Sequence, residues 1–213
     1  MTKVHPNTVV LELDGRSISG FDECQYSAAA VETLTVWRKS LLFNCNGFTV
    51  FDSKGNLVFR VDNYSSTSTR EVVLMDSAGK PLLTVRRKKL SVTDEWLVYN
   101  GEETRKHCLS IKKHMNILHY SNSVLAHLSP CSGGSTGYTV EGSYSQRSCM
   151  VYDERRRLLA EIRPKESVGG VGFGGDVFRL VVQPGLDSAV AMAIVILLEQ
   201  MFGSRGSFSL IRR

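Results

Sequence analysis

The chain has 213 residues, of which 42% are apolar and 22% are charged, a composition typical of one globular domain. Its formal net charge of +5 permits an anionic partner, such as a lipid headgroup or nucleic acid, without requiring one. The five cysteines are odd in number and form no CxxC pair, which argues against a disulfide framework and indicates reduced thiols inside a cell.

Residues 1–33 are only loosely patterned, with one expected strand at Val9–Leu13. We expect them to form an N-terminal extension that packs on, or joins, a main domain spanning residues 34–213. The first ten residues, MTKVHPNTVV, lack the apolar stretch of a signal peptide. We therefore expect an intracellular protein, in the cytoplasm or at a membrane surface, with the nucleus as an alternative.

From Leu34 onward the sequence is dense in predicted strands. Short runs of β-branched and aromatic residues alternate with polar or glycine-containing breaks, as in a sandwich or barrel. The expected strands are Leu34–Trp37, Leu41–Cys45, Phe48–Phe51, Glu95–Tyr99, Cys108–Lys112, Ile117–Tyr120, Val124–Leu128, Tyr138–Gly142, Val177–Val182 and Phe208–Ile211.

Three further segments repeat one pattern of an apolar pair, an Asp, a Gly three residues later, and an alternating strand. They are VFDSKGNLVFRV (Val50–Val61), LMDSAGKPLLTV (Leu74–Val85) and VYDERRRLLAEI (Val151–Ile162), the last with Arg156 at the Gly position. Asp can hydrogen-bond its own backbone in a tight turn, and Gly accepts a positive φ. The pattern predicts three related hairpins.

A helix is predicted over Asp187–Gly203, DSAVAMAIVILLEQMFG, within which every residue from Ala189 to Leu198 is apolar. The run is shorter than the about 20 apolar residues that cross a bilayer, and it has no polar face. Asp187 is expected to cap its start, and Gly203 to end it in the left-handed conformation. Because almost everything before it is predicted strand, we expect a closed sheet around this central helix, which also removes exposed strand edges.

The sequence predicts no catalytic, cofactor or metal site, and we expect no enzyme. Gly170, Gly172 and Gly175 match GxGxxG, but a predicted strand follows where a dinucleotide site needs a helix, so a loop is expected. Nothing in the sequence marks a cysteine as a nucleophile with a paired base. The histidines match no metal-ligand spacing; they are His5, His107, His114, His119 and His127.

Three basic clusters are the candidate binding residues, because clustered cations attract anionic lipid. The alternative is a solvated face in which nearby acids neutralise part of the charge. The clusters are Arg86, Arg87, Lys88 and Lys89; Lys112 and Lys113; and Arg155, Arg156 and Arg157. Nucleic acid is a weaker candidate, because only Trp96 lies near the first cluster, and this Trp is expected in the core or at a barrel rim.

The chain resembles the plant LURP-one-related proteins, whose fold is that of the tubby C-terminal domain and the phospholipid scramblases. The resemblance spans about Leu34 to Gly203 and is carried by LTVWRKSLLFNCNGFTVFDSKGNLVFRVDNY, EVVLMDSAGKPLLTVRRKKLSVTDEWLVYNG, EGSYSQRSCMVYDERRRLLAEIRPK and DVFRLVVQPGLDSAVAMAIVILLEQM. It implies a mainly β fold, a closed twelve-stranded antiparallel barrel around a central hydrophobic helix. The sequence departs from the family at Glu199, where Asp is expected, and at Arg156, where the turn usually has Gly.

For function, the resemblance implies phosphoinositide binding, a link to membrane-tethered transcription regulators, and a role in plant defence. The leading hypothesis is a monomeric, non-enzymatic binding or regulatory domain that engages anionic phospholipid headgroups, with nuclear or signalling proteins as further partners. One alternative is a scramblase-like protein that uses the C-terminal helix as a membrane anchor. Another is a ligand-binding barrel or enzyme of unknown chemistry, although a helix on the barrel axis leaves little room for a ligand.

Overall fold

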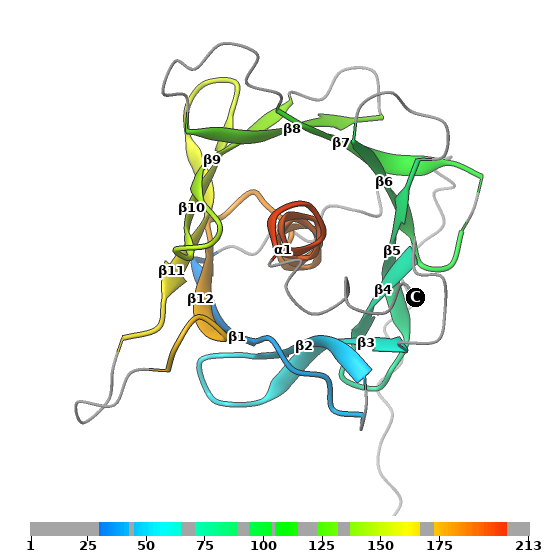
Figure 1. Cartoon of the computed structure of the whole chain (residues 1–213), viewed down its shortest axis with the longest axis vertical. Helices are drawn as coiled ribbons and strands as arrows, with labels where there is room; N and C mark the ends of the chain where they lie inside the picture. The colour runs from blue at the N-terminus through cyan, green and yellow to red at the C-terminus, as the bar shows by residue number, and fades with distance from the viewer. Residues whose placement is uncertain are drawn as a thin grey trace, which may run out of the picture.

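In the part of the chain that the structure describes, twelve strands form one antiparallel sheet that closes on itself, and one helix lies along its axis (Figure 1). In chain order the elements are β1 (Glu32–Trp37), β2 (Cys45–Phe51), β3 (Leu57–Tyr64), β4 (Glu71–Asp76), β5 (Pro81–Arg87), β6 (Glu95–Asn100), β7 (His107–Lys113), β8 (Val124–Pro130), β9 (Tyr138–Ser143), β10 (Ser148–Asp153), β11 (Leu158–Pro164), β12 (Val177–Val182) and α1 (Ser188–Phe202). This computed structural model describes residues 30–42, 45–64, 71–88, 94–103, 105–114, 123–131, 137–166 and 173–203.

The barrel closes because β1 pairs with both β2 and β12, while every other strand pairs with its neighbours in the chain. In the β1–β12 register Leu34 lies opposite Leu180, and Val36 lies opposite Phe178. Since side chains alternate between the two faces of a strand, these four point inward together, and all are buried. The closed barrel around a central helix confirms the predicted fold.

The helix supplies the centre of the core. Every residue of α1 from Ala191 to Leu198 is buried, as expected of an apolar helix enclosed by the sheet. Its start is capped as predicted, because the Oδ1 of Asp187 accepts a hydrogen bond of 3.0 Å from the backbone N of Val190. Among the described residues, no helix is long and apolar enough to span a bilayer.

The prediction for the end of the helix is wrong in its conformation. Gly203 has φ −58° and ψ 143°, which is not left-handed. A Cβ at this position would collide with the backbone carbonyl and the side chain of Glu199, and the backbone N of Gly203 donates to that carbonyl at 2.8 Å. Glycine is therefore needed here for close approach rather than for a positive φ.

The three repeated hairpins have the same turn. In each, the Asp carbonyl accepts from the backbone N three residues on, and the Asp carboxylate accepts from the backbone N four residues on. The carbonyl bonds are 3.0–3.1 Å and the carboxylate bonds 2.8–2.9 Å for Asp52, Asp76 and Asp153. The residue at the third position has φ of 87° in Gly55, 90° in Gly79 and 61° in Arg156. The repeat prediction is confirmed, and Arg156 adopts a conformation that favours glycine.

One expected strand, Leu41–Cys45, is wrong where the structure describes it. Residues 41 and 42 form no strand, and β2 instead runs continuously from Cys45 to Phe51. The hydroxyl of Ser40 accepts from the backbone N of Leu42 at 3.1 Å and donates to the Oδ1 of Asp62 at 2.5 Å. These bonds hold a local turn in place of a strand ladder.

Several predictions fall on parts of the chain that the structure does not describe. They concern the strands Val9–Leu13, Ile117–Tyr120 and Phe208–Ile211, the loop glycines Gly170 and Gly172, and most of the N-terminal extension. The barrel itself begins at Glu32, two residues before the expected domain boundary.

Candidate functional site

The two ends of the barrel differ in chemistry. We name each end after the terminus of α1 that lies there. The C-rim is the end where α1 finishes; its described connecting residues are 38–42, 88, 94, 114, 123, 144–147, 165–166 and 173–176. The N-rim is the end where α1 begins; its described turns are 52–56, 77–80, 101–103, 105–106, 131, 137, 154–157 and 183–187.

The first basic cluster lies at the C-rim end of β5. Each of its described cations is paired with a carboxylate from a neighbouring segment. The pairs are Arg86–Glu71 at 2.7 Å, Arg87–Asp94 at 2.7 Å and Lys88–Glu95 at 2.9 Å. Lys89 lies outside the described residues. Part of the charge of this cluster is therefore neutralised locally, as expected for exposed ion pairs.

The second cluster lies beside the first. Lys112 and Lys113 end β7, and the adjacent register places Lys112 opposite Glu95 on β6. Lys112 is exposed, whereas the Nζ of Lys113 lies 4.7 Å from the ring centre of Phe202 at the end of α1. The fold thus brings the first two clusters together on the C-rim, which their separation in the sequence did not show.

The third cluster lies at the opposite end, in the β10–β11 turn of the N-rim. Arg157 pairs with Asp153 at 2.7 Å, and Arg156 makes two hydrogen bonds to the carboxylate of Glu141. The hydrogen bond from Arg156 lowers the pKa of Glu141 below its ordinary value. Arg155 is exposed. This cluster does not share a surface with the other two.

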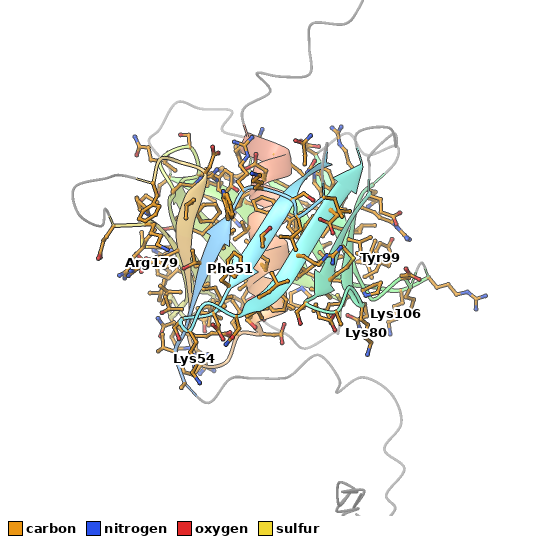
Figure 2. The ribbon with its side chains drawn as sticks, turned by 90° about the horizontal axis from the view of Figure 1, so that it is seen from below. Phe51, Lys54, Lys80, Tyr99, Lys106 and Arg179 are labelled. Carbon is orange, nitrogen blue, oxygen red and sulfur yellow. The ribbon has the colours of Figure 1, made fainter. Side chains whose placement is uncertain are left out.

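Other N-rim turns also carry cations, and Figure 2 shows Lys54, Lys80 and Lys106 at one end of the barrel. Exposed glutamates Glu102 and Glu103 lie in the same rim. Neither glutamate has an ion-pair partner within the described part of the chain. The N-rim is therefore of mixed charge.

At the C-rim the balance of positive and negative charge differs from that at the N-rim. The carboxylates Asp94, Glu95 and Asp176 are each engaged in an ion pair, with Glu166 as the exposed exception. Four lysines at or next to this rim have no ion-pair partner among the described residues. They are Lys39, Lys112, Lys113 and Lys165.

Sequence reasoning missed the exposed apolar side chains of the C-rim. Trp37 is 40% exposed, Leu41 50%, Leu42 36% and Phe173 40%. The pattern WRKSLL, in which cations lie between apolar residues, was the available signal for this exposed surface, but the same pattern is also typical of a strand.

Beneath this surface, Glu199 connects the helix to the barrel wall. Its Oε1 lies 3.0 Å from the Nε of Arg38, and its Oε2 lies 3.6 Å from Arg147 and accepts a 3.0 Å hydrogen bond from the hydroxyl of Tyr144. Burial, and next the charge of Glu199, raise the pKa of Tyr144 above its ordinary value, so this hydroxyl stays a donor. Arg147 also stacks on Tyr144 and Phe178 at 4.3 and 4.5 Å.

The histidine and cysteine positions offer little chemistry. The Nδ1 of His114 and the Nε2 of His127 lie 3.1 Å apart on the barrel exterior, a pairing that the sequence did not reveal. Among the described residues no group of three or more metal-ligating side chains is found. The Sγ of Cys108 donates a 3.3 Å hydrogen bond to the carbonyl of Val98, while Cys131 and Cys149 are free thiols. Burial raises the pKa of Cys149 to about 12.

The region that matches a known protein family begins where the barrel begins. A family model described as LURP-one-related matches residues 32–199. Protein LURP-one-related 8 of Arabidopsis thaliana is 47% identical over 207 residues, which cover 96% of this chain and 100% of the relative. Protein LURP-one-related 17 of the same plant is 42% identical over 216 residues, covering 90% and 98%.

A crystal structure of another Arabidopsis thaliana protein has the same fold. It is 23% identical, covers 84% of this chain and 95% of its own, and superposes with a TM-score of 0.61. The family model covers all twelve strands and most of α1, and the relatives align over nearly their whole length. On these grounds the chain belongs to the LURP-one-related family.

Proposed function

We propose that this protein is a non-enzymatic binding domain that engages the anionic phospholipid headgroups of a membrane surface through the C-rim. One observation carries the proposal: among the residues that the structure describes, lysines without an ion-pair partner gather at the C-rim, where almost all carboxylates are paired. Each cation near an anionic bilayer contributes about 1 kcal/mol of attraction. The N-rim differs, because its cations lie beside Glu102 and Glu103, which have no ion-pair partner in the described part of the chain.

The ion pairs of the first cluster refine which residues take part. Arg86, Arg87 and Lys88 each hold a carboxylate, and breaking these pairs would offset some of the attraction to lipid. Lys112 has no such partner within the described residues and is exposed. Lys112, Lys39 and Lys165 therefore contribute most of the lipid contact, and the first cluster adds long-range attraction.

The alternative of a helical membrane anchor is disfavoured by the burial of α1. Its residues from Ala191 to Leu198 are covered by the barrel, so a bilayer could reach them only if the sheet opened. The alternative of a ligand inside the barrel is disfavoured by the same helix, which lies along the axis (Figure 1) and has buried side chains from Ala191 to Leu198.

Co-sedimentation of the full chain with vesicles tests the proposal at physiological salt. Phosphatidylcholine vesicles containing phosphatidylinositol phosphates should bind the protein, and vesicles of phosphatidylcholine alone should not. Binding should weaken steeply with added salt, because exposed charges are screened. Equal recovery with both vesicles, or none with either, would contradict the proposal.

A pair of triple variants with the same change in net charge provides the control. The variant Lys39→Gln, Lys112→Gln, Lys165→Gln removes three cations from the C-rim. The matched variant Lys54→Gln, Lys80→Gln, Arg155→Gln removes three from the N-rim. We expect loss of binding in the first and retention in the second, whereas equal loss in both would indicate only nonspecific attraction to net charge.

A further inference from the structure

The C-rim presents a short loop whose apolar side chains face outward. Of the five large hydrophobic side chains exposed in the described part of the chain, four lie at this end; only Val31 does not. Trp37 is the last residue of β1, and Leu41 and Leu42 follow in the connection to β2; we call residues 37–42 the rim loop. Phe173 follows in the segment that leads to β12, the strand paired with β1. Exposed apolar side chains gathered at one end of a domain mark an interaction surface.

Buried polar groups hold the rim loop in this orientation. Ser40 is 6% exposed, and its hydroxyl bonds the carboxylate of Asp62 on β3. The hydroxyl of Thr49, on β2, donates to the carbonyl of Lys39 at 2.6 Å. The Ser40 hydroxyl and the Lys39 carbonyl are therefore bonded to the barrel, while the apolar side chains of Leu41 and Leu42 remain exposed.

The start of the loop is fixed to two further elements. The backbone N of Arg38 donates to the carbonyl of Asp176 at 2.7 Å, and its guanidinium pairs with Glu199 of α1 at 3.0 Å. The exposed side chains are thus presented by a loop anchored to β2, β3, α1 and the segment before β12. Such preorganisation lowers the entropy lost on binding.

Lysines accompany the exposed rings. The Nζ of Lys39 lies 5.2 Å from the ring centre of Trp37, and the Nζ of Lys165 lies 5.0 Å from that of Phe173. Tryptophan favours the headgroup level of a bilayer, and lysine can lay its stem along apolar surface while its ammonium reaches phosphate. The core of a protein–protein interface, in contrast, is depleted in lysine. The pairing of rings with lysines favours an anionic bilayer over a protein partner.

We infer that the rim loop is a membrane-insertion loop. Trp37, Leu41, Leu42 and Phe173 enter the boundary between headgroups and acyl chains, while Lys39 and Lys165 contact lipid phosphates. This inference rests on the proposed lipid binding and adds an apolar contribution that is insensitive to salt. It also sets the orientation of the barrel, with its axis directed toward the membrane and the N-rim facing away.

The inference is tested with the full chain and phosphatidylcholine vesicles containing phosphatidylinositol phosphates. The variant Leu41→Ser, Leu42→Ser should lower vesicle affinity by about tenfold or more, because membrane affinity increases with the apolar area that is buried in the bilayer. The variant Val31→Ser is the control, since Val31 is 55% exposed at the other end. Its affinity should equal that of the wild type, and thermal melting should confirm that both variants are folded.

Tryptophan fluorescence gives a second readout. Trp37 is exposed and Trp96 is buried, so only Trp37 should shift to the blue and be quenched by brominated lipids. The variant Trp37→Phe should abolish both effects.

The outcomes separate the two claims. Binding of the wild type with unchanged affinity in the leucine variant, and no quenching of Trp37, would overturn the insertion loop while the proposed function stands. Failure of the wild type to bind anionic vesicles at all would overturn both.

Discussion

The guanidinium of Arg38 and the carboxylate of Glu199 meet at 3.0 Å, joining the rim loop to the last turns of the central helix. Arg147 lies on the other side of the same carboxylate, and its side chain is only 9% exposed. A single acid therefore serves the stability of the core and the orientation of the candidate membrane surface.

The substitution Glu199→Gln should lower the free energy of unfolding by about 3 kcal/mol, because Arg147 would remain buried without an anionic partner. Urea denaturation measures the difference. The matched control is Glu161→Gln, which removes the partner of the exposed Arg163 and should change stability by less than about 1 kcal/mol. Similar small losses in both variants would show that the Glu199 contacts contribute little.

The substitution Ile194→Asp should prevent folding, because it places an unpaired charge in the enclosed helix at a cost of more than about 3 kcal/mol. Circular dichroism and solubility report the outcome. Ile194→Val keeps the site apolar and should lose only about 1 kcal/mol. A folded, soluble Asp variant would contradict the position of this helix in the core.

The repeated turns predict opposite effects for two substitutions. Gly55→Ala should destabilise the protein by roughly 1 kcal/mol, since φ is 87° and an added Cβ meets no atom within 4 Å, leaving backbone strain as the cause. Arg156 has φ 61° but also binds Glu141. In a Glu141→Gln background, which weakens that ion pair, Arg156→Gly should raise stability by a similar amount. The melting temperatures of the wild type, Gly55→Ala, Glu141→Gln and the double variant Glu141→Gln, Arg156→Gly test both directions of change.

Cys149 should resist alkylation in the native protein at pH 8, because burial raises its pKa to about 12 and leaves little thiolate. Mass spectrometry after iodoacetamide treatment measures this, with the urea-unfolded chain as the control. The raised pKa also predicts stability that is unaffected by this group below about pH 9 and declines as the pH rises toward 12. Rapid native labelling of Cys149 would show that the β10 wall opens readily.

The features predicted correctly are those encoded locally. The Asp and Gly positions of the hairpins, the cap at Asp187 and the apolar run of α1 each depend on residues close together in the sequence. Enclosure of the helix followed from its lack of a polar face. These local signals were enough to predict a sheet closed around the helix without information on contacts between distant residues.

The features that were missed depend on contacts between distant residues. The turn at Ser40 is set by Asp62, which lies 22 residues away and on another strand. Without that bond, Leu41 and Leu42 look like part of a buried strand. Strand register likewise places Lys112 beside the first basic cluster and His114 beside His127. Patterns in a single sequence do not specify that register.

Hydrogen exchange with and without vesicles tests the account most directly, because it follows the helix and the rim loop in the same experiment. With phosphatidylinositol phosphate vesicles, amides of residues 38–42 should gain protection, the N-rim turns should remain unchanged, and α1 should stay protected throughout. Loss of protection in α1 on vesicle binding, with no change in the rim loop, would contradict the account and identify the helix as the membrane-binding element.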